Sequence, residues 1–386
     1  MKNIRLILLA IVTLIVIIAA SVAVNLRAPK TVIDKGILFP GLASHINDMT
    51  TLRIKGYGET VTLRKKGDGW VIEEIDDYPA LFDKVKQTII GISELKVVST
   101  KTSNPDLYSR LGVEGPGVAD SPSVLVTLEN NEGKEAAALI VGKQRRSKSA
   151  EKSPGLYVRR PQDKYTLLVE GAVDITARIS SWFERTLFDI PSSSIKEIVT
   201  RHADGDIVRL SRNDRAQEDF TLEDIPEGKK VAIKIVLNRM ATILENFHVS
   251  RARGAGNFAF PEYAHVTTLR TFDGMGITVK SAQIDDVAYV KVKFDYDPEM
   301  AAVASTTADA GGRSGGTDTS STAVDFAAHV SMLNEKLSDW VYTIPEFKYE
   351  ILEKRMADLV KPDINSPSAI GTDEMDVPPL EIPTRQ

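Results

Sequence analysis

The sequence predicts an α+β fold of repeated modules, each an antiparallel β-meander followed by a helix, after an amino-terminal transmembrane helix. Residues 6–24 carry no charge and are mostly Leu, Ile and Val. Beyond them, apolar residues alternate along short segments separated by Gly-, Asp- and Asn-containing turns, as in hairpins. Apolar spacings of three and four then indicate a helix. Because the strands come in runs, the pattern favours antiparallel sheets over an alternating parallel α/β fold.

The first element is a membrane anchor within residues 1–30. Its nineteen uncharged residues, at about 1.5 Å each, span roughly 28 Å, close to the hydrocarbon thickness of a bilayer. The free amino terminus and the basic residues before the run place that end in the cytoplasm and the rest of the chain outside the inner membrane. Apolar residues along the whole length would face lipid, including Leu6, Ile11, Ile15, Ile18 and Val22.

An alternative is a cleaved signal peptide, because Ser21-Val22-Ala23 has the small-x-small pattern of a cleavage site. Signal peptides have a shorter apolar region, of about 7 to 15 residues. The longer run here favours a retained signal-anchor.

The first module occupies residues 31–194. Strands are predicted around Leu52, Val61 and Trp70, with a Gly-containing turn before the last, and a helix follows from Phe82 to Leu95. A helix-free run of short strands comes next, at residues 124–128, 138–141, 156–158 and 165–169, which predicts a further antiparallel meander.

A second module, at residues 195–360, repeats the order strand, strand, strand, helix about 146 to 150 residues later. Its strands lie near residues 198, 208 and 222, and its helix at 233–244. A looser third copy is predicted from 266 to 294, with its helix at 326–337. The segments that begin at Trp182 and Trp340 each end at a proline and are predicted to be short amphipathic pieces that pack their tryptophan.

Two segments differ in composition from the globular remainder. Residues 304–323 are rich in Ser, Thr, Gly and Ala, and residues 361–386 combine five prolines with excess acid. Neither can bury enough apolar surface to offset its ordering entropy, so we expect a flexible loop and a disordered tail.

The order of these elements resembles the bacterial domain-of-unknown-function 4340 family. The resemblance rests on the single anchor, the Gly67-Asp68-Gly69-Trp70 hairpin, the strand at residues 156–160 and the Trp182 and Trp340 segments. It implies an envelope protein without assigned chemistry, often encoded beside an ABC-type transporter and a gliding-motility-like auxiliary subunit.

Candidate chemistry is sparse, and we predict no catalytic, cofactor-binding or metal site. The five histidines lack metal-ligand spacing, and the acidic run 73–77 lacks the order of a calcium loop, so a solvated strand end explains it. With a net charge of −5 and 26% charged residues, composition gives no indication of a nucleic-acid partner. There is no cysteine for a disulfide. One loop, at residues 143–152, gathers cations that could contact anionic lipid or an acidic envelope polymer, namely Lys143, Arg145, Arg146 and Lys148.

From these features we expect a non-enzymatic, single-pass membrane protein that acts as an extracytoplasmic scaffold or accessory subunit. Its partners would be the bilayer and a protein, an ABC permease or its auxiliary subunit. One alternative is an envelope glycan- or lipid-binding module that uses the basic loop. Another is a hydrolase, which would need carboxylates or a Ser/His pair to converge in a pocket.

Overall fold

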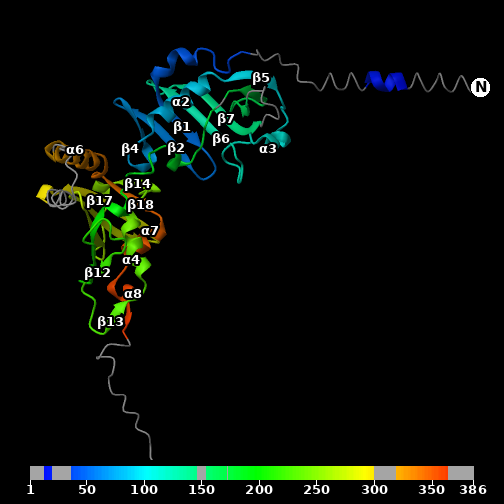
Figure 1. Ribbon diagram of the computed structural model, residues 1–386. Coiled ribbons are helices and arrows are strands. Elements are labelled where there is room, and N and C mark those ends of the chain that lie inside the picture. The colour runs from blue at the N-terminus through cyan, green and yellow to red at the C-terminus, as the bar shows by residue number, and fades with distance from the viewer. Residues whose placement is uncertain (1–12, 20–35, 146–153, 172, 300–318, 364–386) are drawn as a thin grey trace, which may run out of the picture. The chain divides into compact units, whose positions relative to one another are not determined.

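The computed structural model describes residues 13–19, 36–145, 154–171, 173–299 and 319–363 (Figure 1). Among these residues, every helix is too short or too polar to cross a membrane. Of the predicted anchor residues, Ile15 and Ile18 belong to a helical stretch at 13–19, whereas Leu6, Ile11 and Val22 lie outside the described residues. The chain divides into two compact units, Met1–Glu184 and Arg185–Gln386.

The first unit is built on a nine-stranded antiparallel sheet with the strand order β4-β3-β2-β1-β6-β7-β8-β9-β5. Its elements are η1 (Leu42–Asp48), β1 (Met49–Lys55), β2 (Thr60–Lys66), β3 (Gly69–Ile72), η2 (Glu73–Ile75), β4 (Tyr78–Pro79), α2 (Phe82–Ser93), β5 (Lys96–Thr100), η3 (Pro105–Leu107), α3 (Tyr108–Leu111), β6 (Val124–Asn130), β7 (Glu135–Arg145), β8 (Gly155–Arg159), β9 (Thr166–Glu170) and η4 (Ile179–Ser181).

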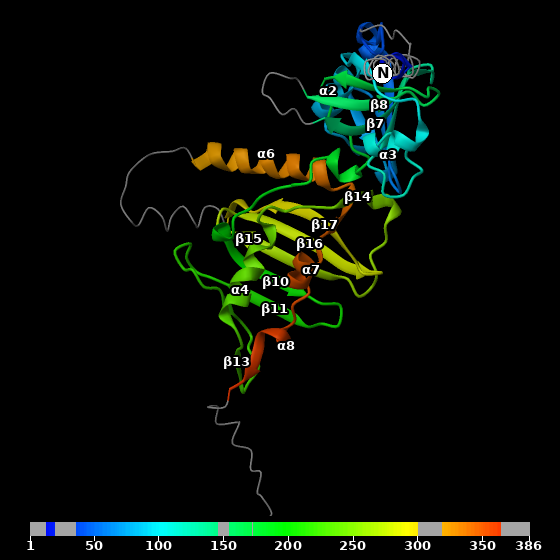
Figure 2. The ribbon, with the colours of Figure 1, turned by 90° about the vertical axis from the view of Figure 1, so that its right-hand side faces the viewer.

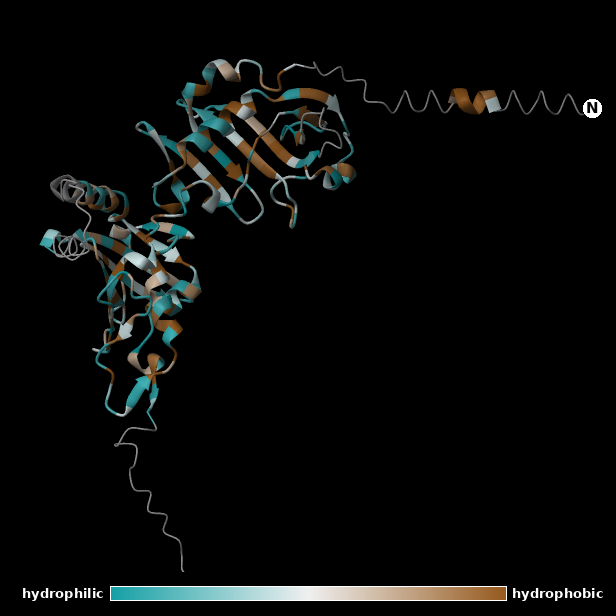
Figure 3. Cartoon of the chain, viewed as in Figure 1, coloured by the Kyte–Doolittle hydropathy of each residue, from teal (hydrophilic) through white to brown (hydrophobic). Residues whose placement is uncertain are grey.

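Alternation of apolar and polar residues gives this sheet a core face (Figure 3). Leu52 lies between Leu63 on β2 and Leu128 on β6, and all three are fully buried. On the other face, Tyr108 and Val113 of the β5–β6 connection pack against Ile140 of β7. This connection is fixed by Arg159, whose guanidinium lies over the Tyr108 ring and donates hydrogen bonds to the carbonyl oxygens of residues 113, 114, 161 and 163.

The second unit is built on an eight-stranded antiparallel sheet with the order β12-β11-β10-β15-β16-β17-β18-β14, and on a two-stranded pair of β13 and β19. Its elements are η5 (Ser192–Ser194), β10 (Ile195–Arg201), β11 (Ile207–Ser211), β12 (Thr221–Leu222), β13 (Lys229–Val231), α4 (Lys234–Ala241), η6 (Thr242–Leu244), β14 (Arg251–Gly254), η7 (Ala255–Asn257), β15 (His265–Thr271), β16 (Met275–Ile284), β17 (Val287–Tyr296), α6 (Thr319–Leu337), β18 (Trp340–Ile344), α7 (Glu346–Leu352), α8 (Met356–Leu359) and β19 (Val360–Pro362).

Apart from β4, an additional edge strand of the first sheet, the two large sheets have the same topology. In each unit three strands form a meander, a helix follows, the next strand pairs at the far edge, and four further strands complete the sheet. The pairing of the first strand with the start of the second meander is irregular at the same place in both, between Met49 and Thr51 and between Ile195 and Glu197. A shared strand order together with a shared bulge indicates that the units are two copies of one architecture.

Helices α4 and α7 pack on one face of the second sheet, and α6 lies beside β17 (Figure 2). The core row on this face includes Leu269, Ile277 and Phe294, which are adjacent across β15, β16 and β17 and are fully buried. Asn334 fixes α6 to the sheet edge, because its side-chain amide accepts a hydrogen bond from Phe294 N (2.9 Å) and donates one to Phe294 O (2.8 Å).

The predicted antiparallel α+β class is confirmed, and strands β6 to β9 form the predicted helix-free meander. The looser third copy is corrected. Strand β15 pairs with β10, and β16 and β17 follow it in the same sheet. These strands are therefore the second half of the second unit and correspond to β6, β7 and β8. The short piece predicted at Trp340 is strand β18, which ends at Ile344 before Pro345, and Trp340 itself is partly buried.

Two boundaries differ from the predicted flexible segments. Helix α6 begins at Thr319, so the last five residues of the predicted loop 304–323 are helical, while 304–318 lie outside the described residues. The predicted tail 361–386 begins in strand β19, where Lys361 and Pro362 pair with Lys230 and Lys229. Residues 364–386 lie outside the described residues.

Candidate functional site

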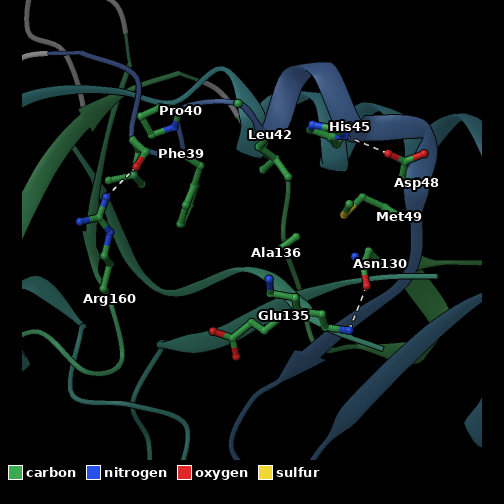
Figure 4. A pocket seen from close by; sticks show the side chains of 13 residues that line it. Phe39, Pro40, Leu42, His45, Asp48, Met49, Asn130, Glu135, Ala136 and Arg160 are labelled. Carbon is green, nitrogen blue, oxygen red and sulfur yellow. Dashed lines mark hydrogen bonds and ion pairs between the residues drawn. The ribbon is translucent and has the colours of Figure 1, made fainter. Parts of the chain in front are cut away.

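A cavity of about 680 Å³ opens in the first unit between η1 and the β6–β7 hairpin (Figure 4). Its lining mixes apolar side chains with both signs of charge. The lining residues are Leu38, Phe39, Pro40, Gly41, Leu42, His45, Asp48, Met49, Asn130, Lys134, Glu135, Ala136 and Arg160. The volume lies in the range of pockets that hold a small ligand or a short peptide segment.

The chain positions η1 over the hairpin through backbone contacts. Gly41 adopts a left-handed φ of 86° immediately before η1, a conformation that a side chain would strain. At the other end of η1, the carbonyl oxygen of Asp48 accepts a hydrogen bond from Asn131 N (3.1 Å). Within the hairpin, the Asn130 side-chain oxygen accepts hydrogen bonds from the backbone N–H groups of Glu132 and Lys134. Both walls of the cavity are therefore fixed by main-chain geometry.

Arg160, the residue after β8, supplies one wall. Its Nη2 donates a hydrogen bond to the carbonyl oxygen of Leu38 (2.6 Å), and its guanidinium lies 5.7 Å from the centroid of the Phe39 ring. Leu42 and Met49 are buried and provide apolar surface. The wall is thus a cation held against an aromatic ring.

The charged residues at the rim are exposed. His45 Nδ1 lies 2.9 Å from an Asp48 carboxylate oxygen, and both side chains are more than half exposed. Among the lining residues that the structure describes, none carries a hydroxyl or thiol group that this pair could activate. No group of three or more His, Cys, Asp or Glu side chains gathers in metal-binding geometry within the described parts of the chain. The arrangement is suited to binding through apolar contact and mixed charge.

The predicted basic loop lies elsewhere in the first unit. Lys143 and Arg145 are at the end of β7, and Arg146 and Lys148 lie outside the described residues. Lys143 Nζ donates hydrogen bonds to the carbonyl oxygens of Ser109 (3.0 Å) and Arg110 (3.4 Å) in α3. This lysine therefore has a structural role at the carboxyl end of that helix, where a cation is favoured.

The acidic run 73–77 is neutralised by neighbouring cations. Arg64 contacts Glu73 (2.6 Å) and Asp77 (2.9 Å), and Lys66 contacts Asp77 (3.0 Å). The hydrogen bond from Lys66, followed by the charge of Arg64, lowers the pKa of Asp77. Glu74 accepts a hydrogen bond from Thr62 N. These contacts account for the run as an ion-paired strand end.

The second unit contains a buried polar row that the sequence did not indicate. His265 on β15 lies opposite Ser281 on β16, and its ring is 5.3 Å from that of His202 and 5.5 Å from that of Tyr349, between centroids. Burial, with smaller effects of His202 and Arg355, lowers the pKa of His265 from 6.5 to about 4.

Ser281 Oγ and His265 Nε2 are both buried and both lack a hydrogen-bond partner. They therefore do not form the serine–histidine hydrogen bond that nucleophilic catalysis requires. His202 is held separately, with its Nε2 3.1 Å from the carbonyl oxygen of Lys354. His202, His265, Ser281 and Tyr349 are all buried, as in a structural element of the core.

The cavity was not predicted from the sequence. Its residues come from three separate segments, 38–49, 130–136 and 160, and no motif links them. The Phe39-Pro40-Gly41 turn was the one local signal, and a turn alone does not indicate a cavity.

Comparison with known families gives one match. A family model described as Domain of unknown function (DUF4340) matches residues 70–264, just over half of the 386-residue chain. The chain belongs to this family. The matched region begins in β3 and ends one residue before β15, so it extends across parts of both units. No curated protein and no solved structure matched the chain.

Proposed function

We propose that the chain is a non-enzymatic accessory or scaffold subunit, anchored in the inner membrane by residues 6–24, for an ABC-type transporter or envelope machine. The uncharged run and its flanking basic residues support a single span with the amino terminus in the cytoplasm and the globular units outside it. The anchor would hold the units beside a membrane partner and raise their effective concentration there.

The observation that carries this proposal is how close the cavity lies in sequence to the predicted anchor. Leu38, its first lining residue, follows Val24, the last residue of the predicted span, by fourteen residues. A chain spans at most about 3.3 to 3.6 Å per residue, so with the anchor in the membrane Leu38 would lie within roughly 50 Å of the end of that span. An occupant of the cavity would then have to reach the same distance from the membrane.

The lining indicates which occupant fits. Apolar contact at Leu42 and Met49, together with the opposite charges of Arg160 and Glu135, suits a peptide segment that carries apolar and charged side chains. An extracytoplasmic loop of a membrane-embedded partner has both this chemistry and this location.

Site-specific crosslinking in intact membranes tests the proposal. A photo-crosslinking amino acid at Ala136 or His45 should capture a permease or its auxiliary subunit, whereas the same group at the exposed Lys65 on β2 should not. Ala136→Trp should fill the cavity and abolish capture from position 45. Equal capture from position 65, or capture of soluble proteins alone, would contradict the proposal.

The glycan- or lipid-binding alternative uses the basic loop 143–152. It has less support among the described residues, because Lys143 is already bonded to two backbone carbonyl groups. Replacing Lys143, Arg145, Arg146 and Lys148 with Gln separates the two functions. Loss of lipid or polymer retention with cavity crosslinks intact would favour the alternative.

A further inference from the structure

The face of the second sheet opposite α4 and α7 carries a cluster of cations. Directly opposed residues of antiparallel strands point to the same face, so the register places side chains in rows. One row runs from Arg201 on β10 through Val266 on β15 to Lys280 on β16 and Lys291 on β17. Lys293, two residues further along β17, lies on the same face. We call Arg201, Lys280, Lys291 and Lys293 the basic face.

These four cations are not neutralised by acidic neighbours. Within the parts of the chain that the structure describes, none of the four makes an ion pair with a carboxylate. Of the acids on the same face, Glu197 and Glu223 contact Arg209 at 3.4 and 3.6 Å, and Asp295, whose carboxylate lies over Gly276, makes no ion pair among the described residues. Lys280 and Lys291 are directly opposite each other, an arrangement of like charges that destabilises a sheet.

The spacing of the basic face matches an extended anionic surface. Neighbouring strands lie about 4.8 Å apart and alternate residues about 7 Å apart, so Lys280, Lys291 and Lys293 form a compact triangle on a sheet face. None of the four lines the cavities beside η1, α2 and α6. The basic face is a part of the sheet surface on which Arg201, Lys280 and Lys293 are exposed.

Aromatic rings adjoin the basic face. The Lys280 ammonium lies 5.1 Å from the Phe260 ring centroid, and Phe258 contacts both Phe260 (4.9 Å) and Tyr289 (4.8 Å). Tyr263 is 60% exposed. Lysine stems and aromatic rings with polar edges are typical of the water–bilayer interface, whereas a soluble polyanion needs charge alone.

We propose that the basic face of the second unit is a membrane-contact surface that binds the phosphate headgroups of anionic phospholipids. It would add to any anchor a second, electrostatic attachment by a different unit of the chain. Each lysine near an anionic leaflet strengthens attachment several-fold, so removing three should lower the ratio of docked to undocked units about a hundredfold. High salt should also weaken the attachment, since Lys280 and Lys293 are exposed and Lys291 is partly exposed.

The absence of cysteine permits a clean test with the full chain. A single Thr278→Cys places a fluorophore on the basic face, and Glu350→Cys places one on exposed α7 across the sheet. The protein is mixed with phosphatidylcholine vesicles that contain a headgroup-attached quencher, with or without phosphatidylglycerol. Quenching is expected only at position 278 and only with phosphatidylglycerol.

Two lysine-to-glutamine variants are matched in charge. Replacing Lys280, Lys291 and Lys293 should abolish the quenching, and replacing Lys234, Lys336 and Lys361 should preserve it. Equal quenching at position 350, or equal loss of quenching in both variants, would overturn the proposal. Binding of soluble polyphosphate by a protein that shows no quenching on lipid vesicles would also overturn it. Carbonate extraction reports separately on the anchor, so failure of the anchor and failure of the basic face are distinguishable.

Discussion

Lowering the pH should destabilise the second unit, because the folded state disfavours protonation of His265. Its imidazole is 4% exposed, faces His202, Tyr349 and Ser281, and has an Nε2 without a hydrogen-bond partner. Burial lowers its pKa from 6.5 to about 4, with His202 and then Arg355 as smaller causes. The folded state thus favours the neutral ring, and the unfolded state binds a proton more readily between these values.

The linkage between proton binding and folding determines how the unfolding free energy changes with pH. The stabilising contribution is complete above pH 6.5 and is lost as pH falls toward 4, because the unfolded chain gains a proton that the folded chain excludes. The loss is about 1 kcal/mol near pH 5.5 and about 2 to 3 kcal/mol near pH 4.5. This loss is a measurable fraction of the unfolding free energy of a domain, which is about 5 to 15 kcal/mol.

Hydrogen exchange measured by mass spectrometry checks this prediction in β15 and β16. His265→Phe retains an aromatic ring but cannot titrate, so the wild type and the variant should diverge as pH falls from 7 to about 4.5. Comparison at each pH cancels the intrinsic pH dependence of exchange. The first unit's β6 and β7 should exchange equally in both proteins. A parallel pH profile for wild type and variant in β15 would refute the assignment.

Two further predictions concern single close contacts. Gly142→Ala would press its new Cβ against the carbonyl oxygen of Leu111, so we expect it to destabilise the first unit by roughly 1–3 kcal/mol and to lower the midpoint of its thermal unfolding. Gly117→Ala is the control, because its new Cβ meets nothing within 4 Å and should have little effect. Equal midpoints for the two variants would contradict the packing argument. Asn334→Ala leaves both backbone groups of Phe294 without their partner and should destabilise the docking of α6 by about 1–3 kcal/mol, seen as faster hydrogen exchange in α6. Asn334→Asp should restore only the hydrogen bond that the side chain accepts from Phe294 N. Unchanged exchange in the alanine variant would show that α6 is held by apolar packing alone.

Much of the secondary structure could be predicted from local pattern. The alternation around Leu52 and Val61 and the Gly-containing turn before Trp70 fix strands β1 to β3 as a meander, because a two-residue period and a tight turn leave no other pairing for neighbours. The three-and-four spacing from Phe82 likewise determined α2.

Long-range pairing was decided only in three dimensions. The sequence determined which residues of β1 and β15 face a core, yet it did not determine that β1 pairs with β6, or that β15 joins β10 instead of starting a third module. The cavity likewise joins segments distant in sequence, and the basic face joins Arg201 of β10 to the β16–β17 hairpin through β15. Local periodicity encodes the face of a strand, whereas the neighbour across the sheet is selected by the combined burial of the whole core.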